Sequence, residues 1–261
     1  MERLEQLEVL NRLLLNDMPE YRQPAERFPH TAEDQRRLLR SLMNLRPPKP
    51  LDPEFLRLQD ELLSAEREEK GVVDVMSLPT TEDSRVILWQ GDITRLKVDA
   101  IVNAANRALL GCFSPCHGCI DNAIHSAAGL QLREECHRIM EAQGQPEPAG
   151  RAKLTKGYHL PARYVLHTVG PIIQGQVTAY DREQLAACYR SCLELTVEHG
   201  LKSVAFCCIS TGEFHFPNQE AAEIAIGTVM EFLKENTSVN KVVFNVFRDV
   251  DRVIYQDLLA V

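Results

Sequence analysis

The sequence predicts an α/β protein preceded by a run of helices, and two observations support this. Up to about residue 70, apolar residues recur at helical spacing. From about residue 72, short β-branched runs alternate with helical patterns, which is typical of a mostly parallel or mixed sheet with helices on both faces. We therefore expect a helical extension over residues 1–71, packed on a main domain over residues 72–261.

The extension is predicted to contain three helices. Leucines in its first 14 residues recur every three or four positions, at Leu4, Leu7, Leu10, Leu13 and Leu14. A second helix is expected over 31–45, where Thr31 can cap the start, and a third over 54–70. The proline-rich stretch 46–53 separates these two helices. The pattern gives no indication of what the extension does.

The main domain is predicted to contain buried strands that alternate with helices. The expected strands are 85–90, 99–104, 163–169, 203–209 and 241–246, and the expected helices are 121–140, 182–199, 217–235 and 250–260. Polar stretches follow four of the strands: GDIT (91–94), NAAN (103–106), STGEFHFP (210–217) and VFRDVD (246–251). Ligands of such sheets bind at the carboxyl ends of the strands, so we expect one composite pocket there. The competing interpretation is that these loops are polar only because they are loops.

STGEFHFP is the best candidate for a phosphate-binding loop. Its small residues permit close backbone approach, and Pro217 is a natural first residue for the helix that follows. Backbone N–H groups there could hold a diphosphate without a lysine. Asp92 could accept a hydrogen bond from a base amine or a ribose hydroxyl, and Asn103 and Asn106 could bind sugar hydroxyls. Each of these three residues taken singly is equally compatible with a local turn.

Composition excludes several classes of function. The formal net charge is −8, and no long Lys/Arg run exists, so a nucleic-acid duplex is not expected as the partner. The first 17 residues carry charges throughout and do not resemble a signal peptide, and no apolar run approaches membrane-spanning length. We therefore expect a cytoplasmic protein with no membrane contact. In a reducing compartment its eight cysteines favour metal binding or catalysis over disulfides.

The stretch GCFSPCHGCIDN (111–122) contains a candidate metal site. Cys112, Cys116, His117 and Cys119 are soft ligands that suit Zn²⁺. Four ligands would make a closed structural site, whereas three would leave a position for water or substrate. Asp121 is expected to be either the N-cap of the next helix or a base beside the metal. His125, one helical turn later, is expected to be a packed or capping residue.

Four stretches, in this order, resemble the macrodomain family, an ADP-ribose-binding fold. They are GDIT, VDAIVNAAN, the run from AGRAKLTKG to HTVGP (149–171) and ISTGEFHFP, and the resemblance covers about residues 85–260. It implies a three-layer α/β/α structure with a central mixed sheet. GCFSPCHGCID stands where ordinary macrodomain hydrolases have a glycine-rich segment. This resembles the zinc-containing, MacroD-like microbial subgroup, whose members also carry a helical N-terminal extension.

The resemblance also implies roles for individual residues. The zinc ligands would be Cys112, His117 and Cys119, with one Zn²⁺ per chain, while Cys116 is a further thiolate that the subgroup pattern does not need. Asp92 would read the adenine amine with Ile93 beside it, and Phe247 or Asn245 would flank the adenine. The catalytic residues at the distal ribose would be Asp121, Asn106 and Phe214. The diphosphate loop would be Ser210, Thr211, Gly212, Glu213 and Phe214.

The function implied by the resemblance is a zinc-dependent protein mono-ADP-ribosyl hydrolase, a glycosidic-type hydrolase expected to act as a monomer. Its partners would be ADP-ribose and mono-ADP-ribosylated proteins, a lipoyl-carrier protein being one candidate. Two alternatives stay open. One is a non-catalytic ADP-ribose reader with a structural zinc, and the other is a redox or zinc-sensing regulator. Asp121 beside a three-ligand metal favours the enzyme, because a reader needs no base there.

Overall fold

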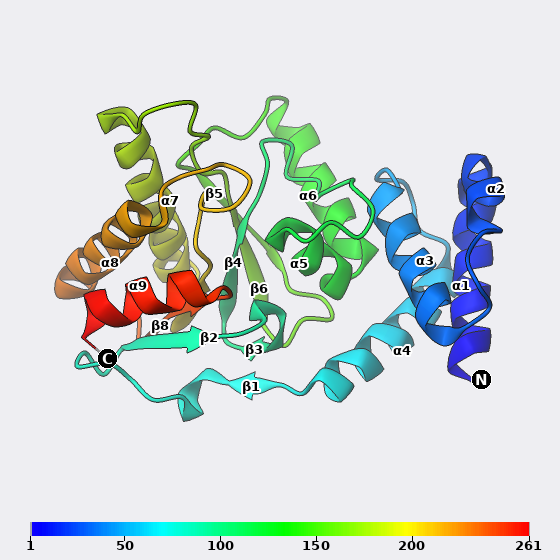
Figure 1. Cartoon of the computed structure of the whole chain (residues 1–261), viewed down its shortest axis with the longest axis horizontal. Helices are drawn as coiled ribbons and strands as arrows, with labels where there is room; N and C mark the ends of the chain where they lie inside the picture. The colour runs from blue at the N-terminus through cyan, green and yellow to red at the C-terminus, as the bar shows by residue number, and fades with distance from the viewer. Residues whose placement is uncertain (1, 261) are drawn as a thin grey trace.

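The computed structural model describes residues 2–260 and confirms the three-layer α/β/α architecture (Figure 1). The central sheet has six strands in the order β2-β8-β7-β4-β6-β5. Neighbouring strands are parallel except for β5, which runs antiparallel to β6, so the sheet is mixed as expected. These strands are β2 (Val86–Gln90), β4 (Ala100–Ala104), β5 (Ala152–Lys156), β6 (Tyr164–Thr168), β7 (Ser203–Phe206) and β8 (Lys241–Val246).

Helices cover both faces of the sheet because its central strands are apolar on both sides. Every residue of β7 is buried, as are the first four residues of β4. Figure 1 shows α7 and α8 on one side, with α9 against α8, and α5 and α6 on the other. These helices are α5 (Ile120–Ala128), α6 (Leu130–Gln143), α7 (Ala179–Glu198), α8 (Asn218–Glu235) and α9 (Asp249–Leu259). Among residues 2–260, no helix has the length and hydrophobicity needed to cross a lipid bilayer.

The extension lies beside α5 and has a hydrophobic core of its own (Figure 1). That core is built from leucines of its helices and also includes Leu130 at the start of α6. The helices are α1 (Arg3–Asp17), α2 (Arg22–Ala25), α3 (Ala32–Leu45) and α4 (Pro53–Lys70), with a short 3-10 turn η1 (Pro19–Tyr21). Thr31 caps α3 as expected, and its hydroxyl accepts from the Asp34 N–H at 3.1 Å.

Two short strands and two 3-10 turns connect the extension to the sheet. β1 (Val73–Asp74) pairs in parallel with β3 (Leu96–Lys97), and η2 (Val75–Ser77) and η3 (Ile93–Arg95) follow β1 and β2 respectively. The sequence analysis did not predict these short strands or β5. β5 lies at the edge of the sheet and is only half-buried over most of its length, so its residues show little apolar periodicity.

The helix expected over 121–140 is two helices in the structure. Gly129 separates α5 from α6 with a φ of 96°, a backbone conformation that favours glycine. The amide oxygen of Gln59, from α4, accepts a hydrogen bond from the Leu130 N–H at 2.9 Å. The extension therefore satisfies a backbone donor at the start of α6, which an N-terminal helix end leaves without an intrahelical partner.

Candidate active site

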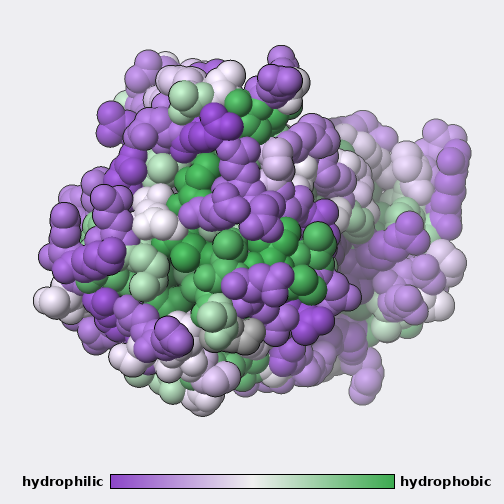
Figure 2. Space-filling model, turned by 60° about the vertical axis from the view of Figure 1, so that its left-hand side comes forward, coloured by the Kyte–Doolittle hydropathy of each residue, from purple (hydrophilic) through white to green (hydrophobic). Residues whose placement is uncertain are grey.

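The four polar stretches meet at one edge of the sheet. β2, β4, β7 and β8 are mutually parallel or linked through parallel neighbours, so their carboxyl ends lie on the same side. On the α/β domain, Figure 2 shows hydrophobic residues at the floor of a hollow that hydrophilic residues surround. A hollow of this kind suits a ligand with both apolar rings and polar groups.

The loop between β7 and α8 leaves several donors free for an anion. The backbone N–H groups of Gly212, Glu213 and Phe214 donate no hydrogen bond to any residue within 2–260. The hydroxyl of Ser210 is buried without a partner among the same residues, and the Ser210 backbone has a φ of 65°. The structure therefore places unsatisfied donors where the diphosphate was predicted. Pro217, expected to begin α8, is instead its N-cap, and the helix begins at Asn218.

Asp92 caps the turn η3 at the end of β2. Its carboxylate accepts from the Thr94 N–H at 2.9 Å and from the Thr94 hydroxyl at 2.7 Å, so the turn interpretation of this residue is correct. It also lines a pocket of about 120 Å³ between η3, α5 and helices of the extension, together with Arg40 and Arg95. Ile93 beside it is buried.

Of the two residues considered for the adenine, the structure favours Phe247. The Asn245 amide donates to the carbonyl oxygen of Gly91 at 2.9 Å and thereby holds the turn after β2. Phe247, directly after β8, is 74% exposed at the same edge of the sheet. Its ring is available to a ligand, whereas the Asn245 side chain is already engaged.

Asp121 lies in the first turn of α5 and is held by two asparagines from the end of β4. The Asn103 amide donates to Asp121 Oδ1 at 2.8 Å, and the Asn106 amide lies 3.4 Å from Asp121 Oδ2. Asp121 is only 5% exposed, and burial raises the pKa of its carboxyl to about 6. Asp121 is not the N-cap of α5. Cys119 takes that position, and its sulfur accepts from the Asn122 N–H at 3.4 Å.

His167 supports Asn103 from the neighbouring strand. The parallel register pairs the two residues, and the Asn103 amide nitrogen lies 3.2 Å from His167 Nδ1. His167 Nε2 lies 2.9 Å from the Thr155 hydroxyl, and burial lowers the pKa of the imidazole to about 3. A neutral ring that donates from Nε2 and accepts at Nδ1 satisfies both contacts. Sequence reasoning missed His167, although a histidine inside an apolar strand is a signal for such a buried partner.

His125, Cys136 and His167 form a second group of potential ligand atoms, within 4.8 Å of one another. Both ring nitrogens of His167 already have hydrogen-bond partners, and the group is fully buried. Burial raises the pKa of Cys136 beyond the range in which a thiolate forms. We therefore interpret this group as part of the packed core under Asp121, which agrees with the expectation that His125 is a packed residue.

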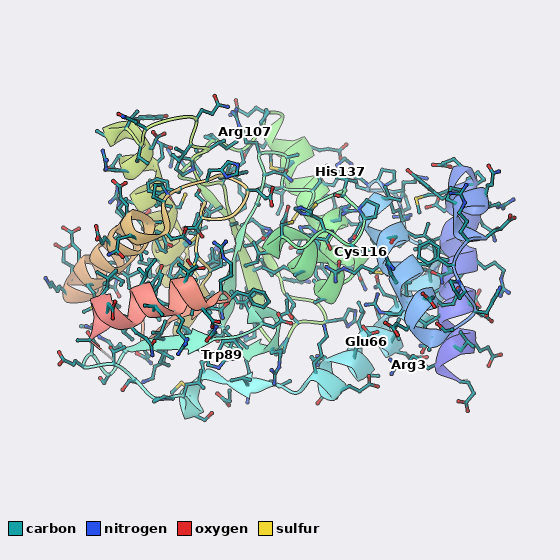
Figure 3. The ribbon with its side chains drawn as sticks, in the orientation of Figure 1. Arg3, Glu66, Trp89, Arg107, Cys116 and His137 are labelled. Carbon is teal, nitrogen blue, oxygen red and sulfur yellow. The ribbon has the colours of Figure 1, made fainter. Side chains whose placement is uncertain are left out.

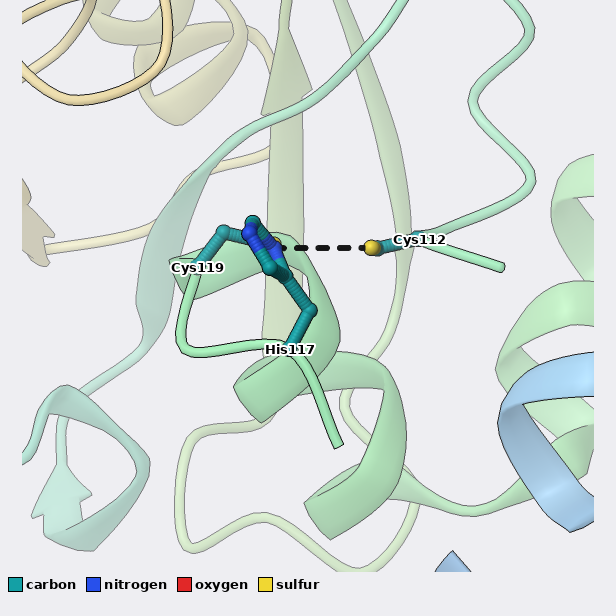
Figure 4. Close-up of side chains that lie close together, drawn as sticks. All are labelled: Cys112, His117 and Cys119. Atoms are coloured by element: carbon teal, nitrogen blue, oxygen red, sulfur yellow. Dashed lines mark hydrogen bonds between the residues drawn. The ribbon is translucent and has the colours of Figure 1, made fainter. Parts of the chain in front are cut away.

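Cys112, His117 and Cys119 bring three ligand atoms within 4.8 Å of one another (Figure 4). Cys112 Sγ lies 3.8 Å from His117 Nδ1. Burial and the nearby Cys112 raise the pKa of Cys119 to about 11, so this thiol stays protonated until a cation displaces its proton. Two sulfurs and one imidazole at this separation fit the ligand set that Zn²⁺ prefers.

Cys116 is not part of this group. Its sulfur points to α3, 3.4 Å from the Ser41 hydroxyl and 3.7 Å from the Arg37 carbonyl oxygen. Its backbone has a φ of 53°, which turns the side chain away from the neighbouring ligands. The loop therefore offers three converging ligand atoms, one fewer than a closed tetrahedral zinc site uses.

The loop that contains Cys112, His117 and Cys119 contacts the diphosphate loop. His117 Nε2 lies 3.7 Å from Glu213 Oε1, and both side chains are partly exposed. Phe214 is half-buried beside them and packs on the main hydrophobic core. The two loops therefore meet close to Asp121, the region that the sequence analysis assigned to the distal ribose.

Similarity to known proteins identifies the family of this chain. A model of the Macro domain matches residues 102–225. Over 250 residues, the chain is 51% identical to a "Protein-ADP-ribose hydrolase" of Treponema medium, covering 95% of each chain. The chain belongs to the macrodomain family. A Staphylococcus aureus protein of the same name is 49% identical over 247 residues, covering 94% of this macrodomain chain and 92% of the relative.

Solved macrodomain structures have the same fold as this chain. The Oceanobacillus iheyensis macrodomain with ADP superposes with a TM-score of 0.60 at 41% identity, covering 66% of this chain and 88% of that one. The Trypanosoma brucei macrodomain in complex with ADP-ribose gives a TM-score of 0.65 at 33% identity, covering 84% and 94%. The fold predicted from sequence and its family are therefore both confirmed.

Proposed function

We propose that this macrodomain removes mono-ADP-ribose from modified proteins and that zinc is required for the reaction. The observation that carries the proposal is the buried Asp121 carboxylate beside a three-ligand Cys–His–Cys set. Two relatives at about half identity carry the name protein-ADP-ribose hydrolase, and two macrodomain structures contain ADP or ADP-ribose. Both facts support the same substrate.

ADP-ribose would bind with its diphosphate on the free N–H groups of residues 212–214. Its adenine would lie near Asp92 and Ile93, with the exposed ring of Phe247 beside it. Asp92 Oδ1 already accepts two hydrogen bonds from Thr94, so the second carboxylate oxygen would meet the adenine amine. The distal ribose would then reach Asp121, Asn106 and Phe214.

The reaction would be hydrolysis of the bond between the anomeric carbon of that ribose and the protein side chain. Cys112, His117 and Cys119 would hold the zinc, which would supply Lewis-acid chemistry there. Asp121 would accept the proton of the attacking water, and Asn103 and Asn106 would hold its carboxylate in place. The water oxygen bonds to the anomeric carbon, the bond to the acceptor breaks, and the acceptor takes up a proton.

The test measures hydrolysis and binding separately. Asp121→Asn keeps the shape of the side chain but removes the base, and we expect turnover of a mono-ADP-ribosylated protein to fall by ~10²–10⁴. ADP-ribose affinity, measured by calorimetry, should change much less, because the diphosphate and adenine contacts are untouched. Cys119→Ser should lose zinc and turnover together.

Two outcomes would contradict the proposal. If Asp121→Asn and Cys119→Ser both hydrolyse at the parent rate, the reaction uses neither this base nor zinc, and the loop is structural. If the parent protein binds no ADP-ribose, the diphosphate assignment is wrong as well. A panel of substrates modified on acidic, serine and arginine side chains, with a lipoyl-carrier protein among the acceptors, would identify the acceptor.

A further inference from the structure

The metal loop, residues 105–119, has no regular secondary structure and lies against α3 of the extension. Figure 3 shows Cys116, from this loop, on the side that faces α3. The two segments are more than 70 positions apart in the sequence, so nothing in the local pattern predicted their contact. Three anchors join them.

The first anchor is Asn44, near the end of α3. Its amide oxygen accepts a hydrogen bond from the Cys116 N–H at 2.9 Å, and its amide nitrogen donates to the Ser126 hydroxyl at 3.1 Å. Cys116 adopts a left-handed backbone conformation that non-glycine residues rarely take without support. Asn44, 2% exposed, supplies that support and so fixes the chain direction between Cys112 and His117.

The second anchor is Arg40, one turn earlier on α3. Its guanidinium donates to Asn122 Oδ1 at 2.8 and 3.2 Å, and one of its nitrogens lies 3.5 Å from the carbonyl oxygen of His117. Asn122 in turn donates to the carbonyl oxygen of Ser114 at 2.9 Å. Arg40 therefore contacts the backbone of His117 directly and, through Asn122, is linked to Ser114, so it holds the loop on both sides of Cys116.

The third anchor is Arg133 on α6, which is buried. It donates to the carbonyl oxygens of Met43, Asn44 and Arg46 at the end of α3, at 2.6 to 3.0 Å. It also donates to the carbonyl oxygen of Leu110 at 2.7 Å, just before Cys112, and its guanidinium lies 4.3 Å from the centre of the Phe113 ring. Arg133 thus ties the start of the metal loop to the end of α3.

We propose that α3 of the extension holds the metal loop in its ligand-forming conformation, with Asn44 and Arg40 as positioning residues for zinc. This inference rests on the zinc site proposed above. A loop without secondary structure must lose conformational entropy to bring three ligands together, and anchors that order it beforehand reduce this cost on metal binding. Residues that orient metal ligands typically change metal affinity 10–100-fold when removed.

The experiment measures zinc affinity of the full chain by competition with a chromophoric chelator. Asn44→Ala and Arg40→Met should each weaken zinc binding about tenfold or more. Asn44→Asp keeps an acceptor for the Cys116 N–H and should restore most of the affinity. Such rescue distinguishes a positioning role from a general loss of packing.

Two matched controls come from the extension itself. Asn11 is a buried asparagine like Asn44, 3% exposed, but its amide donates to Gln35 inside the extension. Arg36 lies one turn before Arg40 and pairs with Glu66 at 2.6 Å. Asn11→Ala and Arg36→Met should keep zinc affinity within about twofold of the parent, although both lower stability.

A second readout needs no metal. In protein treated with a chelator, amide hydrogen exchange over residues 110–122 should be faster in Asn44→Ala and Arg40→Met than in the two controls. Equal zinc affinity and equal exchange in all four variants would overturn the inference and leave the zinc proposal intact. If the parent binds no zinc, the zinc proposal fails, and the exchange data alone decide whether α3 orders the loop.

Discussion

Cys116 shows how the direction of one side chain decides how many candidate ligand atoms converge. Its thiol lies within the same eight residues as Cys112, His117 and Cys119, so the residue types left a four-ligand site open, although the resemblance favoured three ligands. The structure separates them, because the Cys116 sulfur contacts Ser41 and Arg37 on α3. The presence of a cluster was predictable from residue types. The exclusion of Cys116 followed only from the resemblance, because the contacts that direct its sulfur to α3 span more than 70 residues.

We predict that Cys116→Ser retains one zinc per chain with an affinity close to that of the parent. The hydroxyl can still contact Ser41 and the Arg37 carbonyl oxygen, and no ligand atom is lost. Cys119→Ser is the matched variant, since it changes the same atom three residues later, at a predicted ligand. It should reduce the zinc content of protein purified without added metal. Equal loss of zinc from both variants would show that Cys116 is a fourth ligand.

The elements of the sheet were largely predictable, and their ends were less so. Buried strands such as β4 and β8 can be recognised in the sequence as runs rich in β-branched residues. The half-buried edge strand β5 cannot be recognised in this way. A single glycine inside a helical pattern is tolerated in many helices, so Gly129 alone did not reveal the break between α5 and α6. At the break, the Gln59 side chain from the extension accepts a hydrogen bond from the Leu130 N–H, a contact that the local pattern does not contain.

The loop after β6 packs tightly against the diphosphate loop, and this contact makes Gly170 a position that controls binding. A Cβ atom at Gly170 would lie 1.9 Å from the Ser210 hydroxyl and 2.9 Å from a methyl group of Ile209. Gly170→Ala must therefore displace the start of the diphosphate loop. Overpacking of this kind costs ~1–3 kcal/mol, so we predict a loss of ADP-ribose affinity of about tenfold, measured by calorimetry.

Two further variants identify the cause of that loss. A Cβ at Gly227, inside α8, would meet no atom within 4 Å, so Gly227→Ala should bind ADP-ribose like the parent. Gly170→Ala combined with Ser210→Gly removes the colliding hydroxyl at a residue whose φ of 65° suits glycine. If the double variant binds no better than Gly170→Ala, the steric explanation is wrong.

At the scale of the whole molecule, two hydrophobic cores meet at a seam that contains buried polar groups. The core of the extension includes Leu130 from α6, while Arg133 and Gln59 make hydrogen bonds across the seam. Deeper in the main domain, His125 and His167 are buried without charge, because burial lowers the pKa of both imidazoles. Folding therefore excludes protons that the unfolded chain would bind.

We predict that the free energy of unfolding decreases as the pH falls below about 6.5. An imidazole in the unfolded chain has a pKa near 6.5, whereas burial lowers the pKa of His167 in the folded protein to about 3. Between these values the unfolded state binds more protons, so each buried histidine removes up to about 1.4 kcal/mol per pH unit. Asp121 acts in the opposite direction below pH 6, because its pKa is raised in the folded state.

Urea denaturation at pH 7.5, 6.5, 5.5 and 5.0 would measure this dependence. His167→Gln cannot titrate and should show a shallower slope than the parent, although its stability at pH 7.5 is lower. A parent whose stability is constant between pH 7.5 and 5.0 would contradict the assignment of neutral buried histidines.

The attachment of the metal loop to α3 limits how these parts can be exchanged between proteins. A chimera that carries residues 110–119 on a macrodomain without the extension would contain every candidate ligand and none of the acceptors and donors that Asn44 and Arg40 provide. Such a graft should be a poor zinc binder despite a complete ligand sequence. Both α3 and the loop would have to be transplanted together, since residues of α3 make hydrogen bonds that hold the loop although the two segments are far apart in the sequence.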